Sequence, residues 1–167
     1  AVGGGIRSEA DAAAVVNAGA DKISINTAAL TNPSLITRLS TRYGSQAVIV
    51  AIDAKREGNH FTVYARSGQT AANRNAIEWA QEAADRGAGE ILLTSIDRDG
   101  TRCGFDCELT AAVSTAVPIP VIASGGAGMV GGQLLDVEAE SGEVDLAALE
   151  EIHLGKTARL IAASCVI

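Results

Sequence analysis

Five short runs of apolar and β-branched residues recur along this chain, and each ends abruptly at small, hydroxyl or acidic residues. Runs that are apolar throughout are typical of strands buried on both faces, which is the condition of a parallel sheet. In parallel α/β proteins, chemistry is carried at the carboxyl ends of the strands. The runs span residues 1–5, 22–27, 48–53, 90–95 and 120–126.

Helical patterns separate these runs, as in consecutive βαβ units. The segment 60–65 alternates in polarity and predicts part of a hairpin that leans over the carboxyl end of the third run. The rhythm predicts an α/β fold with five parallel strands, which are too few to close an eight-stranded barrel. A five-stranded open sheet is an alternative. Capping residues and glycine stops predict four helices, over residues 8–18, 33–43, 73 or 75 to 86, and 106–116.

The composition argues against several classes of partner. A net charge of −7 disfavours binding to nucleic acid or to a membrane surface. No segment approaches the length of a membrane span, and the first residues lack the basic-then-apolar pattern expected of a signal peptide. The three cysteines lack disulfide spacing, which fits a cytoplasmic location. Cys103 and Cys107 lie four residues apart, but no His or further Cys is nearby to complete a zinc site, so no metal site is expected.

Asp53 is the first candidate for chemistry because it ends the most apolar run of the chain. Desolvation at such a position raises the pKa of a carboxyl group toward values that suit a general acid or base. The alternative is a structural carboxylate that caps the next turn or pairs with Lys55 or Arg56. Both interpretations remain open from spacing alone.

Small and polar residues end the other runs in patterns that suit an anion. The glycines at 3–5 and the Ser-Gly-Gly at 124–126 allow backbone N–H groups to approach a phosphate, or form tight turns. Asn26 and Thr27 can donate to the same anion, or cap the helix that follows. Residues 97–101 form either an ordinary acidic turn or a loop that grips a substrate above the fourth run.

The chain changes character after Gly128, where strand signals disappear. Residues 131–138 predict the start of a helix, and 145–167 predict one long helix with apolar residues at near-helical spacing. The shift predicts a boundary at 127–129 between an α/β region and a helical tail.

The motifs of residues 1–128 are highly specific in combination. They lie at 2–6, 19–29, 44–46, 51–56, 87–97, 99–101 and 122–128. Together they closely resemble the cyclase subunit of imidazole glycerol phosphate synthase, from histidine biosynthesis. The resemblance implies a partial (β/α)8 (TIM) barrel that contains strands three to seven of the family. It also implies a cyclase without a cofactor.

In that family the substrates are ammonia, delivered by a glutaminase partner, and a bis-phosphorylated ribulosyl-formimino aminoimidazole carboxamide. The products are imidazole glycerol phosphate and an aminoimidazole carboxamide ribotide. By this resemblance, Asp53 is one of two catalytic aspartates, and Thr94 lies beside the reacting centre. Lys22 and Glu90 match charged residues at the barrel floor, where ammonia enters. The substrate is held at one phosphate by Gly5, Asn26 and Thr27, and at its other end by Asp99, Gly100, Ser124, Gly125 and Gly126.

The chain departs from the family pattern at both ends. It begins at the third strand, so the partner aspartate of the first strand is absent and we expect a fragment with little activity alone. The Ala-Ala-Ser that ends the eighth strand of the family occurs at 162–164, too far along and within a helical pattern. A second hypothesis is a non-enzymatic, phosphate-binding half-barrel that associates with a glutaminase, or with itself through open sheet edges.

Residues 128–167 resemble a different family, the farnesyl and geranylgeranyl diphosphate synthases. The matching segments are 128–133, 135–136, 138–140, 149–150 and 152–157, and Lys156 would contact a diphosphate. The aspartate-rich magnesium motifs of that family are absent, so prenyl transfer is a remote alternative. The sequence therefore predicts a cyclase domain over 1–128 and a prenyl-synthase-type tail over 129–167. A natural fusion, an engineered chimera and an assembly artefact remain open as origins of this join.

Overall fold

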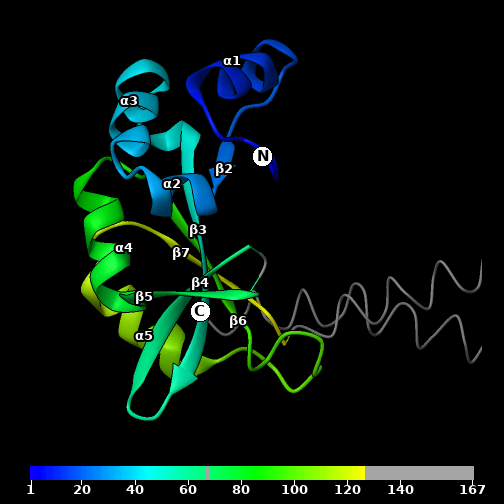
Figure 1. Ribbon diagram of the computed structural model, residues 1–167, viewed down its shortest axis with the longest axis vertical. Coiled ribbons are helices and arrows are strands. Elements are labelled where there is room, and N and C mark those ends of the chain that lie inside the picture. The colour runs from blue at the N-terminus through cyan, green and yellow to red at the C-terminus, as the bar shows by residue number, and fades with distance from the viewer. Residues whose placement is uncertain (67, 127–167) are drawn as a thin grey trace, which may run out of the picture.

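A sheet with five parallel strands forms the centre of the computed structural model, which describes residues 1–66 and 68–126 (Figure 1). The parallel strands follow one another across the sheet in chain order. They are β1 (Val2–Gly3), β2 (Ile23–Ile25), β3 (Val48–Glu57), β6 (Glu90–Ser95) and β7 (Val121–Ser124). The five predicted parallel strands are confirmed.

Helices α3, α4 and α5 lie along one side of the sheet in Figure 1. All four predicted helices are present, and three are capped as predicted, because Ser8, Asn75 and Asp106 each accept a hydrogen bond from the first turn that follows. The helix predicted from residue 33 begins at Ser34, with Pro33 at its N-cap position and no side-chain capping bond. The helices are α1 (Glu9–Asn17), α2 (Thr27–Thr31), α3 (Ser34–Tyr43), α4 (Ala76–Asp85) and α5 (Cys107–Ala116), with a 3-10 turn η1 (Ser45–Ala47). The short helix α2 was not predicted from the sequence.

An antiparallel hairpin extends the carboxyl end of β3. It consists of β4 (His60–Ala65), which confirms the predicted hairpin strand, and β5 (Thr70–Asn75). Of the two predicted starts for the next helix, Asn75 is correct and Asn73 is wrong. Residues 70–75 pair with β4 instead, and the Asn75 side chain then caps α4 by accepting from the Ile77 N–H at 2.8 Å.

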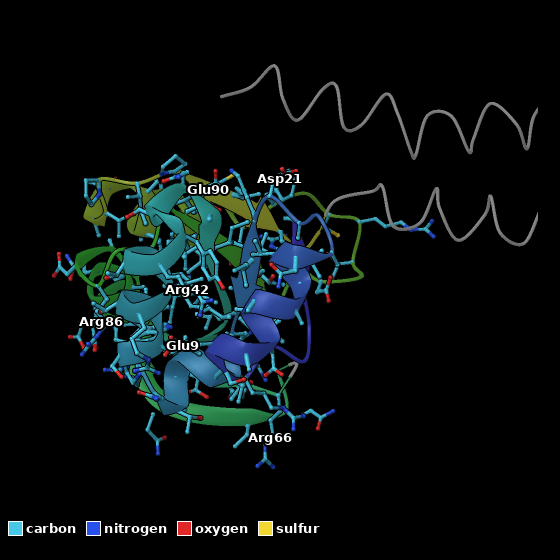
Figure 2. All side chains as sticks on the ribbon, turned by 90° about the horizontal axis from the view of Figure 1, so that it is seen from above. Glu9, Asp21, Arg42, Arg66, Arg86 and Glu90 are labelled. Atoms are coloured by element: carbon cyan, nitrogen blue, oxygen red, sulfur yellow. The ribbon has the colours of Figure 1, made fainter. Side chains whose placement is uncertain are left out.

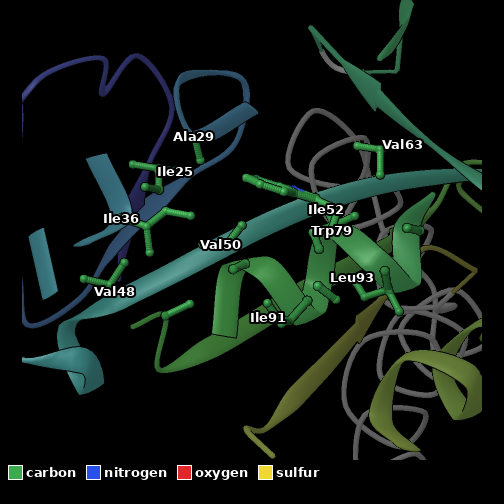
Figure 3. Packing of buried hydrophobic residues seen from close by; sticks show 14 of the residues in the cluster. Ile25, Ala29, Ile36, Val48, Val50, Ile52, Val63, Trp79, Ile91 and Leu93 are labelled. Carbon is green, nitrogen blue, oxygen red and sulfur yellow. The ribbon is translucent and has the colours of Figure 1, made fainter. Parts of the chain in front are cut away.

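Alternate residues of each central strand face the helices and form the core. In β3 these are Val48, Val50 and Ile52, which are fully buried, and in β6 they are Ile91 and Leu93 (Figure 3). Trp79 of α4 packs among them. Full burial of an aliphatic side chain of this size stabilises a fold by about 1.5–3 kcal/mol, so this layer holds the sheet and the helices together.

The intervening residues point to the opposite face of the sheet. They include Ala51 and Asp53 of β3 and Leu92 and Thr94 of β6, which are only partly buried, and Ile122 of β7, which is 43% exposed. Right-handed crossovers between strands in sequential order place their helices on one face, as in a barrel rather than in a doubly wound sheet. The fold is α/β and corresponds to part of a (β/α)8 barrel, whose inner face carries these residues.

The predicted boundary at 127–129 and the predicted helical tail over 129–167 lie outside the described residues. Within the described part of the chain, no helix is both long and apolar enough to cross a membrane.

Candidate active site

Three predicted site residues form one row where the parallel pairing of neighbouring strands ends. The prediction that the third strand ends at Asp53 is wrong, because β3 continues to Glu57 and pairs there with β4. Asp53 of β3 is the parallel partner of Thr94 in β6, and Thr94 is the partner of Ser124 in β7. Neighbouring strands lie about 4.8 Å apart, and paired residues point to the same face. The register therefore brings a carboxyl group and two hydroxyl groups together on the inner face of the sheet.

The surroundings of Asp53 favour a carboxyl group that exchanges protons. Burial raises the pKa of Asp53, the Asn26 amide opposes this shift, and the negative charge of Asp99 adds to it. The Asn26 Nδ2 donates to Asp53 Oδ2 at 3.0 Å and fixes the direction of the carboxyl group. Within the described residues, Asp53 forms no ion pair with Lys55 or Arg56, so that structural alternative is not supported.

The side chain of Asn26 donates a hydrogen bond to the Asp53 carboxyl group and does not cap helix α2, which it precedes. It occupies the N-cap position of α2, but its side chain makes no capping hydrogen bond. The alternative in which the Asn26 side chain caps the following helix is therefore not supported. Its amide oxygen Oδ1 is buried and has no hydrogen-bond partner among the described residues. A buried acceptor in that state is ready to receive a donor from a bound molecule or from water.

A pocket of about 750 Å³ lies next to this row and contains the first predicted phosphate site. Gly5, Asn26 and Thr27 all line it. Gly4 and Gly5 have φ values of 87° and 74°, and a Cβ atom at either position would meet nothing within 4 Å. Their backbone therefore borders open space. Arg7 and Arg66 also line this pocket, and neither was predicted from the sequence as a site residue.

The second predicted cluster lies where the end of β7 meets the loop after β6. The Gly104 N–H donates to the Gly126 carbonyl at 3.0 Å. A Cβ atom on Gly126 would lie 2.1 Å from the Gly104 carbonyl oxygen, and one on Gly125 would lie 2.6 Å from that of Ser95. Both glycines are therefore required by close backbone approach.

The loop after β6 carries Asp99 and Gly100, and its turn is held by backbone contacts. The N–H groups of Arg98 and Asp99 donate to the Ser95 carbonyl at 3.2 and 3.0 Å. The Arg56 N–H donates to Asp97 Oδ2 at 2.8 Å, which ties the loop to β3. Asp99 and Gly100 themselves are exposed. A further pocket of about 880 Å³, which the sequence did not predict, lies below this loop and is lined by residues such as Arg56, Phe105 and Asp106.

Lys22 and Glu90, the two residues predicted to lie at the floor, form an ion pair at the amino ends of the strands. Lys22 precedes β2 and Glu90 begins β6, with β3 between them. Figure 2 shows Glu90 and Arg66 on opposite sides of the molecule. The charged floor and the pocket with Arg66 are therefore at opposite ends of the sheet.

Across residues 1–66 and 68–126, no group of three or more His, Cys, Asp or Glu side chains is arranged to hold a metal ion. The side chains available for chemistry at the row are the Asp53 carboxyl, the Asn26 amide and the hydroxyls of Thr94 and Ser124. These groups suit proton transfer and hydrogen bonding to a polar ligand.

A family model described as "Histidine biosynthesis protein" matches residues 1–147. The chain belongs to this family. It is 66% identical over 127 residues to a protein of Acidobacterium capsulatum named imidazole glycerol phosphate synthase subunit HisF, which covers 76% of this chain and 50% of the relative. Proteins with the same name from Myxococcus xanthus and Pyrobaculum aerophilum are each 56% identical, over 128 and 129 residues.

Each of the latter two matches covers 77% of this chain and 51% of the relative. The chain thus spans about half the length of the curated relatives that it matches. The predicted membership in a histidine biosynthesis family is confirmed.

Proposed function

We propose that this chain carries part of the active site of an imidazole glycerol phosphate synthase cyclase. This enzyme closes the imidazole ring with ammonia and releases imidazole glycerol phosphate and an aminoimidazole carboxamide ribotide. The observation that carries the proposal is the row of Asp53, Thr94 and Ser124 where the parallel pairing of three adjacent strands ends, with Asn26 bonded to Asp53.

Asp53 would move protons during ring closure. A general acid or base works best when its pKa lies near the operating pH, and burial moves the pKa of Asp53 upward in that direction. The Asn26 amide would keep the carboxyl group pointed toward the inner face. Thr94, paired with Asp53 in the sheet, would place a hydroxyl beside the reacting atoms.

Two clusters would hold the ends of a bis-phosphorylated substrate. Gly5, Asn26 and Thr27 share one pocket and would bind one phosphate. The other end of the substrate would lie over the opposite side of the row, against Asp99, Gly100, Ser124, Gly125 and Gly126. In the strand order, Asp53 and Thr94 lie between the strands that carry the two clusters, and ring closure would occur there.

Ammonia would enter at the opposite end of the sheet, beside the ion pair of Lys22 and Glu90, from a glutaminase subunit. The inner face between this pair and Asp53 carries Ile49, Ala51 and Leu92, which are small or apolar. Neutral ammonia passes such a surface without a desolvation penalty as large as that of ammonium. The proposed enzyme works in the cytoplasm and needs no cofactor.

We test this function in a full-length background. Residues 1–126 replace the matching segment of the Acidobacterium capsulatum relative, and turnover is measured with ammonium salt as the nitrogen source. We expect an active chimera in which Asp53→Asn lowers turnover by about 10²- to 10⁴-fold, the usual contribution of a general acid or base. The matched control is Asp21→Asn, an exposed aspartate before β2, which leaves turnover unchanged.

Near-parental turnover of the Asp53→Asn chimera would show that the carboxyl group is not catalytic. A folded but inactive chimera with Asp53 intact would also contradict the proposal, because the site residues would then fail in a complete barrel.

A second candidate function is phosphate binding without turnover. The pocket with two arginines favours it, and self-association of β1 and β7, the end strands of the described parallel sheet, would accompany it. The same chimera separates the two functions, because a binding module would hold phosphate and show no dependence of turnover on Asp53. The division at residue 128 and the prenyl-synthase-type tail remain proposals. Limited proteolysis of the full chain tests them by the expected first cleavage near 127–129.

A further inference from the structure

The pocket beside Gly4 and Gly5 has an unusual charge for this protein. The chain carries 20 acidic and 13 basic residues, yet the residues that line the pocket include two arginines and no carboxylate. Within the described part of the chain, the side chains of Arg7 and Arg66 form no ion pair, whereas Arg38, Arg56, Arg74 and Arg86 each contact a glutamate. Positive charge without a protein counter-charge favours an anionic ligand.

Arg66 reaches this pocket from a distant part of the sequence. It follows β4 at the end of the hairpin and lies at the rim of the molecule in Figure 2. Its N–H donates to Thr27 Oγ1 at 3.1 Å, across a separation of 39 residues. This hydrogen bond ties the hairpin to Thr27, which the family resemblance predicts to contact a phosphate.

The same bond sets the role of the Thr27 hydroxyl. A hydroxyl has one proton to donate and two lone pairs to accept with. The backbone N–H of Arg66 occupies one lone pair, and the Thr27 hydroxyl donates to no other group among the described residues, so its proton is available to a ligand. Arg66 has a φ of 53°, a left-handed conformation that costs a non-glycine residue energy. The hairpin thus holds an arginine where glycine would be easier to accommodate.

From these contacts we infer that Arg66 is a specificity residue for a phosphate monoester. Its guanidinium folds over the phosphate oxygens while the backbone of Gly4 and Gly5 and the hydroxyl of Thr27 contact them from below. Arg7 supplies further positive charge from the other side of the pocket. The inference deepens the proposed function, on which it rests, by assigning part of the first phosphate site to the hairpin.

The dianion is the preferred form of the ligand. A phosphate monoester loses its second proton near pH 6, and a planar guanidinium pairs with two of its oxygens at once. Affinity should therefore rise as the pH passes about 6, and it should fall with added salt because the site is open to solvent. Lysine would keep the positive charge of Arg66, but it lacks the planar pair of N–H donors with which a guanidinium binds two phosphate oxygens.

The experiment titrates ribose 5-phosphate, with ribose as the neutral control, into the full chain and follows the amide signals of Gly4, Gly5 and Thr27. We expect Arg66→Ala to weaken binding about tenfold, the usual loss for a charge-assisted hydrogen bond, and Arg66→Lys to weaken it about threefold. The matched control is Arg102→Ala, because Arg102 is also exposed with a φ of 57° but lies outside this pocket.

Arg66→Gly separates ligand binding from folding. Glycine relieves the left-handed backbone, so this variant should be as stable as the original chain or more so, yet bind ribose 5-phosphate as weakly as Arg66→Ala. If Arg66 had only a structural role, Arg66→Gly would change stability and affinity for ribose 5-phosphate in the same direction. That result would overturn the inference.

Two further outcomes distinguish this inference from the proposed function. Unchanged affinity in Arg66→Ala, with signals that still shift at Gly4 and Thr27, would overturn the role of Arg66 and leave the phosphate site intact. No shifts at these amides in the original chain up to about 10 mM ligand, a weak limit, would overturn both the role of Arg66 and the phosphate site.

Discussion

The two faces of the sheet formed by β3, β6 and β7 differ in burial and in chemistry, although they are made by alternate residues of the same strands. On the face toward the helices, Val50 and Ile52 are fully buried and Leu93 is 1% exposed. On the other face, Leu92 is partly buried and Ile122 is 43% exposed. The middle of the helix face is apolar, whereas the inner face ends in Asp53, Thr94 and Ser124.

Within a single strand, the residues on the helix face therefore contribute mainly to stability, and those on the inner face are available for function. Side chains of a strand alternate between faces, so each residue can be selected for one task. The helix face supplies most of the burial that holds the strands in register. The inner face then presents polar groups at fixed spacing, at a smaller energetic cost because they remain partly exposed to water. The comparison predicts that equal substitutions on the two faces have unequal effects.

The largest expected effect is on stability at neighbouring leucines. Leu93→Ala should lower the free energy of unfolding by about 2–5 kcal/mol, since it opens a cavity in the packed layer under α4 and α5. Leu92→Ala, the matched control on the inner face, should cost less than about 1.5 kcal/mol because the side chain is already partly exposed. Urea unfolding followed by circular dichroism measures both. Equal losses would mean that the inner face is as well covered as the helix face.

An intermediate effect is expected at the polar residues of the helix face. Asp106 accepts from the Leu109 N–H at 3.0 Å, which caps α5, and from the Ser95 hydroxyl at 3.1 Å. Ser95 is only 1% exposed. Asp106→Ala should cost about 1–2 kcal/mol because a cap is lost and the Ser95 hydroxyl loses its acceptor.

The control for Asp106 is Asp21→Ala, an exposed aspartate outside any helix cap, which should stay within about 0.5 kcal/mol of the original chain. Thermal unfolding at pH 7 compares the two variants. A loss at Asp106 no larger than at Asp21 would show that the buried hydroxyl is satisfied without the carboxylate.

The smallest expected effect is the pH dependence of stability at Asp53. Because burial raises the pKa of Asp53 in the folded state, the folded chain binds this proton more tightly than the unfolded chain does. The resulting stability is fully present below the ordinary pKa of an aspartate and is lost as the pH rises through the folded value. Asp53→Asn removes this loss, so its Tm should exceed that of the original chain at pH 7.

The difference in Tm should vanish near pH 3, where both side chains are neutral. Calorimetry of Asp53→Asn at pH 3, 5 and 7 measures the trend. A variant that is less stable than the original chain at pH 7 would mean that the ionised carboxylate is stabilised rather than desolvated. In that case Asn26 would outweigh burial, and the sign of the pKa shift would be reversed.

The sequence by itself determined the elements that depend on neighbouring residues. Apolar runs predicted the five parallel strands, and Ser8, Asn75 and Asp106 marked helix starts through caps that act within three residues. Asp53 stood out because a carboxyl group ended the most apolar run. The short helix α2 could not be predicted from periodicity, because its five residues are too few to show a helical period.

Only the tertiary structure decided which distant residues meet. The register of β3, β6 and β7 aligned Asp53 with Thr94 and Ser124, and a one-residue slip would have turned these side chains to the helix face. The bond between Asn26 and Asp53 joins segments 27 residues apart. Arg66 enters the first pocket only because β4 and β5 fold over the end of β3. The alternating pattern of residues 60–65 predicted a hairpin strand, but the register of strand pairing and the contacts of Arg66 depend on the whole sheet.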